Sequence, residues 1–98
     1  MVVVAKLKAK SGEEGKMEEA LRGMVSKVEA EEGTLMYSLH RSQKDSTQFL
    51  FYEKYKDAEA LKAHSETAYF KELFGALQPL LDGAPVIEMY DELAGLNK

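Results

Sequence analysis

The segment from Phe49 to Phe70 changes its hydrophobic period from two to about 3.6 within one short stretch. Its first seven residues alternate as a strand does. One face of that strand carries Phe49, Phe51, Glu53 and Tyr55. Asp57 can then cap a helix on which Leu61 and His64 share a face, with a break expected at residues 65–67. One strand–helix unit thus carries a carboxylate, several phenols and an imidazole, so we expect the functional site there.

The same periodicities predict the other elements. They are a strand over residues 1–10, a helix over 13–32, a strand over 34–41, a polar turn at 43–47 and a last strand over 86–93. On the first strand, Val3, Ala5 and Leu7 can face a core while the lysines face solvent. Gly33 is a natural stop for the first helix. The turn at 43–47 should join its flanking strands as a hairpin, and residues 94–98 are expected to form a loose tail.

The order β-α-β-β-α-β favours an α+β fold of the ferredoxin-like kind, with a four-stranded antiparallel sheet and both helices on one face. The other face of such a sheet has no cover. The two middle strands nevertheless offer apolar side chains on both faces. These are Leu35, Tyr37 and Leu39 against Met36, and Phe49, Phe51 and Tyr55 against Leu50 and Tyr52. Because an exposed apolar patch marks an interface, we expect a homodimer that covers one sheet with another.

Composition narrows the classes of partner. Ninety-eight residues suit a single domain, and a formal charge of −4 argues against nucleic acid or an anionic membrane surface as the main partner. The apolar runs are too short to span a bilayer, and no signal segment opens the chain. The absence of Cys excludes a disulfide framework and a thiol nucleophile. We therefore expect a cytoplasmic protein.

Two runs of residues together resemble a known family. They are Glu32-Gly33-x-x-x-Tyr37-x-x-His40 and Phe51-Tyr52-Glu53-x-Tyr55-x-Asp57-x-x-Ala60-Leu61-x-x-His64-x-x-Thr67-x-x-Phe70. This spacing resembles the antibiotic biosynthesis monooxygenase domain, and more narrowly its small bacterial quinol monooxygenase-like members. The resemblance implies a ferredoxin-like fold in a dimeric α+β barrel. It also implies one of several activities, because characterised members oxygenate anthrones and quinols without metal or flavin, degrade haem, or isomerise a phosphorylated signalling sugar.

The sequence departs from that family pattern at informative positions. Tyr69 stands where similar members often have a second His, and Tyr55 stands where an aromatic residue, often Trp, is expected. Haem-degrading and some anthrone-oxidising relatives use an Asn and a Trp, but this chain has no Trp and its one Asn is Asn97 in the tail. Haem degradation therefore loses most of its support. Anthrone oxidation lacks the Asn and the Trp that assist it in some relatives.

Oxygenation without a cofactor needs a base, a donor for the developing oxyanion and a pocket that excludes water. His64 is the best base, because an ordinary imidazole titrates near neutral pH. Glu53 could orient His64, or act as the base itself if burial raised its pKa. A turnover rate that rises with pH near the pKa of His would favour His64 as the base. An already ionised Glu would give no such rise near neutral pH. The side chains expected to bind a small aromatic substrate are Tyr37, Phe51, Tyr55, Tyr69, Phe70 and Phe74, with Tyr52 as a further hydrogen-bond donor.

Other interpretations of the same residues stay open. A buried or boundary His can be purely structural, Glu53 can be a cross-strand partner of Arg41, and the aromatic residues can belong to the core or to a dimer interface. His40 and His64 lack the spacing of a metal site, so no metal is expected, and no cofactor is expected either. The functional alternatives are a cofactor-free monooxygenase of quinol- or anthrone-like aromatics and a non-catalytic dimeric barrel that binds a small apolar metabolite or acts in stress response. Isomerisation of a sugar-derived molecule is a weaker third.

Overall fold

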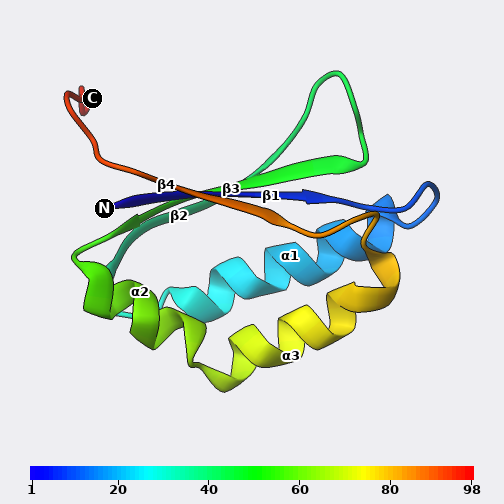
Figure 1. Ribbon diagram of the computed structural model, residues 1–98, viewed down its shortest axis with the longest axis horizontal. Helices are drawn as coiled ribbons and strands as arrows, with labels where there is room; N and C mark the ends of the chain where they lie inside the picture. Colours follow the sequence, from blue (N-terminus) through cyan, green and yellow to red (C-terminus); the bar gives the residue numbers. More distant parts are fainter.

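A computed structural model describes all of residues 1–98. Its elements are β1 (Val2–Lys8), α1 (Glu14–Val28), β2 (Thr34–Arg41), β3 (Gln48–Tyr55), α2 (Ala58–Ser65), α3 (Ala68–Leu77), the short 3₁₀ helix η1 (Gln78–Leu80) and β4 (Val86–Tyr90). The strands form one antiparallel sheet in the order β2-β3-β1-β4. All three α-helices lie on one side of that sheet, and the other side is open (Figure 1). The α+β ferredoxin-like prediction is therefore confirmed. No helix is both long and apolar enough to cross a membrane.

The strand register sorts alternate residues between the two faces. In the β2–β3 hairpin Tyr37 lies opposite Glu53, and in the β1–β3 pair Val3 also lies opposite Glu53. Glu53 therefore sits in the middle of the sheet, with a neighbour on either side. Every second residue of β3 is buried, as its alternation predicts: Phe49, Phe51, Glu53 and Tyr55. The sheet thus presents one fully covered face to the helices.

The core lies between this face and the helices. Its central cluster joins side chains from β1, β3, α1 and α3, together with Ala9 and Leu81 from an isolated bridge. Its largest members are Met17, Leu21, Phe49, Phe51 and Leu77. From the predicted inward face of the first strand, Ala5 and Leu7 belong to this cluster, while Val3 is buried outside it. Burial of these apolar groups is the main force that docks the helices on the sheet.

Two predicted element ends and the predicted face of one side chain are wrong. The first helix ends at Val28 rather than at residue 32, and the chain turns there. Val28 is the last buried residue of the apolar stripe, so residues beyond it gain nothing by continuing the helix along the sheet. The last strand ends at Tyr90 rather than at residue 93. Leu35 was expected on the same face as Tyr37, but a register shift between Thr34 and Met36 leaves it 60% exposed.

Candidate active site

An apolar cavity of about 210 Å³ lies between the covered face of the sheet and helices α2 and α3. Sixteen residues line it, and 13 of them are hydrophobic. The other three are Glu53, His64 and Ser65. A pocket that is mostly apolar, with a few convergent polar groups, is the usual form of a small-molecule site. The strand–helix unit that the sequence singled out therefore supplies all of the cavity's non-hydrophobic side chains.

His64 reaches the cavity because α2 is fixed at both ends. Asp57 caps its N-terminus, accepting a hydrogen bond from the amide of Ala60 at 2.8 Å. Thr67 closes its C-terminus by donating its hydroxyl to the carbonyl of His64 at 2.8 Å, and the same residue caps α3. The predicted break at 65–67 is thus confirmed as a junction between two helices. It turns α3 and its aromatic residues toward the imidazole.

The His64 ring is enclosed by aromatic rings. Its centroid lies 5.4 Å from that of Tyr37, 5.5 Å from that of Tyr55 and 5.2 Å from that of Phe70. Only 2% of the residue is exposed, so it is a core residue rather than a boundary one. An imidazole so placed is shielded from bulk water but still borders the cavity. A molecule bound in the cavity would therefore lie next to this imidazole.

Glu53 is the second ionisable group on the cavity. It is 5% exposed, and the hydroxyl of Tyr55 donates to its Oε1 at 2.5 Å. The pKa of Glu53 is raised to about 7: burial raises it most, the hydrogen bond from Tyr55 lowers it, and the negative charge of Glu31 raises it. Burial also raises the pKa of Tyr55 and of Tyr37 well above that of an ordinary phenol. Near neutral pH the cavity therefore holds a carboxyl group poised between its two protonation states, beside phenols that stay protonated.

Glu31 is a site residue that the sequence did not reveal. It lies in the turn after α1, and its carboxylate contacts Nδ1 of His64 at 3.0 and 3.1 Å. The predicted orientation of His64 by Glu53 is therefore wrong, because the strand directs Glu53 toward Tyr55 instead. The predicted partner of Glu53, Arg41, is also engaged elsewhere, since it pairs with Glu18 and lies over the ring of Phe49.

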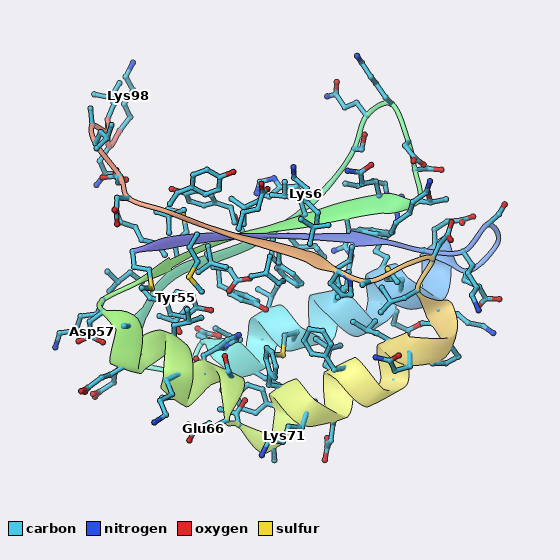
Figure 2. All side chains as sticks on the ribbon, in the orientation of Figure 1. Lys6, Tyr55, Asp57, Glu66, Lys71 and Lys98 are labelled. Atoms are coloured by element: carbon cyan, nitrogen blue, oxygen red, sulfur yellow. The ribbon has the colours of Figure 1, made fainter.

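The expected substrate-binding side chains divide into two groups. Tyr37, Phe51, Phe70 and Phe74 line the cavity. Tyr55 and Tyr69 do not line it, and their hydroxyls donate to Glu53 and Glu31 respectively. Figure 2 shows Tyr55 between the sheet and the helical layer, on the opposite side of the sheet from Lys6. Tyr52 lies on the same open face as Lys6, away from the cavity, because the strand alternates.

Comparison with known proteins places the chain among relatives. The model of the family described as "Antibiotic biosynthesis monooxygenase" matches residues 1–76. This chain belongs to the antibiotic biosynthesis monooxygenase family. A Bacillus subtilis (strain 168) member, "Putative monooxygenase YcnE", is 31% identical over 94 residues, which cover 96% of this chain and 98% of that protein.

Solved structures of similar chains agree with this family assignment. The crystal structure of a "putative antibiotic biosynthesis monooxygenase" from Caulobacter crescentus CB15 is 36% identical, with a TM-score of 0.89 over 95% of this chain and 89% of that one. The crystal structure of PA3566 from Pseudomonas aeruginosa is 31% identical, with a TM-score of 0.89 over 95% and 93%. The resemblance to the antibiotic biosynthesis monooxygenase family is therefore confirmed, and the family fold extends over nearly the whole chain.

Proposed function

We propose that this protein is a monooxygenase that oxidises a small quinol- or anthrone-like aromatic molecule with O₂ and needs no bound cofactor. Family membership and the description of the Bacillus subtilis relative support a monooxygenase-like activity in general. The observation that carries the finer proposal is the cavity itself. It is apolar, it fits between aromatic side chains, and it brings an imidazole and a carboxyl group to the same bound molecule.

The chemistry draws its electrons from the substrate. A buried base removes a proton, and the resulting electron-rich anion passes an electron to O₂ before the two radicals combine as a peroxide on the substrate carbon. In an anthrone-like molecule the CH₂ carbon becomes a carbonyl. One oxygen atom stays in that carbonyl, the other leaves as water, and the carbon supplies all four electrons. The protein contributes the base, aromatic walls and exclusion of water, which protects the intermediates from side reactions.

His64 is the proposed base, with Glu53 as the competing candidate. The pKa of Glu53 is raised to about 7, so a rate that rises with pH near neutrality no longer excludes Glu53 as the base. The variant Glu53→Gln distinguishes the two candidates, since Gln cannot titrate. A rising limb that survives in Glu53→Gln supports His64, whereas a limb that disappears assigns the base to Glu53.

Oxygen uptake tests the proposal directly. Purified protein is mixed with a panel of reduced naphthoquinones and anthrones, and O₂ consumption is compared with that of the same panel in buffer. The matched variant is Leu73→Trp, whose larger side chain should fill the cavity and abolish uptake. Uptake that is faster than buffer and sensitive to Leu73→Trp supports the oxygenase. If O₂ uptake with the protein is no faster than in buffer for any compound of the panel, the oxygenase proposal is contradicted. The alternative of a non-catalytic binding barrel is then favoured.

The isomerase alternative receives no support from the cavity. A phosphorylated sugar needs cationic or backbone donors to hold its phosphate. No lysine or arginine lines the cavity, and its only cationic candidate is the imidazole of His64. The apolar lining instead favours a flat aromatic ligand.

The homodimer is also part of the proposal. Several large apolar side chains remain exposed on the sheet and its β4 edge, among them Met36, Val86, Ile87, Met89 and Tyr90. Ile87 and Met89 border the cavity as well, so a partner that covers β4 would also close its mouth. A second copy of the chain offers a surface of the same apolar character.

A further inference from the structure

Glu31 occupies a rigid position although it lies in a turn. Its amide donates to the carbonyl of Val28 at 2.9 Å, and its carbonyl accepts from the amide of Thr34 at 3.3 Å. Nearby, Gly33 packs directly on α2, where a Cβ at Gly33 would lie only 2.4 Å from that of Ala60. The turn is therefore docked against the helix that carries His64. The backbone itself holds the carboxylate beside the imidazole.

Three donors converge on the Glu31 carboxylate. The Thr34 hydroxyl donates to Oε1 at 2.9 Å, the Tyr69 hydroxyl donates to Oε2, and Nδ1 of His64 contacts both oxygens. A carboxylate can only accept hydrogen bonds, so the contact with Nδ1 requires a proton on that nitrogen. Nε2 makes no hydrogen bond to the protein, and in the neutral ring it carries the lone pair. That is the nitrogen left to act on a molecule in the cavity.

We infer that Glu31 is a positioning residue that holds His64 in the Nδ1–H tautomer, with Nε2 free to take a proton from the substrate. The catalytic role of this tautomer rests on the proposed function, whereas the positioning of His64 by Glu31 does not. Glu31 does not line the cavity, so it acts through His64 rather than by touching the substrate. Its side chain is 15% exposed and that of His64 is 2% exposed, so water competes little for the bond between them. Free imidazole prefers its proton on Nε2, and the carboxylate reverses that preference.

The tautomer can be read without any activity. The chain has two histidines, and His40 is exposed and contacts only Ser38, so the variant His40→Gln leaves His64 as the single imidazole. Long-range ¹H–¹⁵N correlation spectra at mildly alkaline pH then distinguish the protonated nitrogen from the bare one. We expect Nδ1–H in His40→Gln and a shift toward Nε2–H when Glu31→Gln is added. Glu32→Gln, one residue away and exposed, removes the same charge and should leave the spectrum unchanged.

Two spectroscopic results would overturn the inference. One is an Nε2–H ring in His40→Gln itself, which is decisive even if the Glu31→Gln variant does not fold. The other is an Nδ1–H ring that persists in folded Glu31→Gln, because some other acceptor would then hold the proton.

Kinetics test whether the tautomer matters for oxygenation. Carboxylates that orient metal-bound histidines are worth about 10–100-fold in activity, and we expect kcat of Glu31→Gln to fall by a similar factor. KM should change little, since Glu31 does not touch the cavity. An unchanged kcat together with an altered tautomer would overturn the catalytic part of the inference. If wild type consumes no O₂ but its ring is Nδ1–H, the oxygenase proposal fails and the positioning by Glu31 stands.

Discussion

The two faces of the sheet are built from alternate residues of the same strands, yet they differ in what they can do. On the face covered by helices, Phe49, Phe51 and Glu53 are almost completely buried. On the open face, charged side chains pair with one another in solvent: Lys6 with Glu88 at 3.3 Å, and Lys54 with Glu92 at 3.1 Å. The helices decide the difference, because they exclude water from one face only (Figure 1).

Glu53 and Glu88 show the consequence most directly. Both are strand glutamates, but Glu53 accepts from a neutral phenol in the interior whereas Glu88 faces a lysine at the surface. Burial raises the pKa of Glu53 to about 7. The covered face thus acquires a group able to exchange protons at neutral pH, while the open face has the charges and exposed apolar groups of a surface suited to assembly. The comparison predicts large effects on chemistry from one face and effects on association from the other.

The largest effect is expected at His64. Replacing it as His64→Gln should lower turnover by about 10²–10⁴-fold, the usual worth of a positioned general base. Gln is preferred to Ala because the site is buried, and a large void there would also lower the stability of the fold. Steady-state O₂ uptake measures the loss, and circular dichroism checks the fold. The control is His40→Gln. His40 is exposed and lies outside the cavity, so this variant should retain full turnover. Unchanged turnover in folded His64→Gln would mean that His64 is not the base. Either Glu53 is then the base, or the substrate autoxidises in a dry pocket.

The next effect concerns stability at Glu53. Its folded-state pKa of about 7 exceeds the 4.5 of an ordinary glutamate, so between these pH values the unfolded chain loses a proton that the folded chain keeps. Stability from this group is therefore lost as pH rises from about 4.5 to 7, by up to about 3 kcal/mol. Glu53→Gln should remove that loss and be more stable than wild type at pH 8 but not at pH 4.5, as measured by urea unfolding.

The matched variant on the open face is Glu88→Gln. It loses only a partly exposed ion pair with Lys6, so its unfolding free energy should differ from that of wild type by less than about 1 kcal/mol at both pH values. A similar pH response in the two variants would show that the helices do not make the two faces electrostatically distinct. If Glu53→Gln kept the pH dependence of wild type, the pKa of Glu53 would lie near its ordinary value.

What the sequence could predict follows from the range of the forces involved. The change from strand to helix near Asp57 and the break before α3 are local, and both were predictable from periodicity and capping residues. The inward position of His64 was equally predictable, because Leu61 and His64 share a helical face. Its complete burial was not, since it depends on rings contributed by β2, β3 and α3.

Glu31 could not have been found by the same means. It stands 33 positions from His64 and 38 from Tyr69, and no local pattern links residues so far apart. Residues 29–32 contain three glutamates, which indicate only a solvated stretch, and Gly33 set the predicted end of the helix at residue 32. The chain instead leaves the helix after Val28, and the turn delivers the carboxylate to α2. Only the position of Gly33, close enough to a helix end to mark a turn, was a usable signal.

The smallest effect is expected on the open face, where association rather than chemistry should respond. Tyr52 lies on this face of β3, half-buried and opposite Val4 of β1. If two sheets cover one another, Tyr52→Asp places a charge in their interface and should raise the dimer dissociation constant by about 30-fold, or about 2 kcal/mol. Sedimentation velocity at micromolar concentration measures this shift. Gln78→Glu adds the same charge at an exposed position after α3 and should leave the dimer intact. A monodisperse wild-type monomer in that experiment would contradict the dimer outright, and would mean that the exposed apolar side chains of β4 tolerate water without a partner.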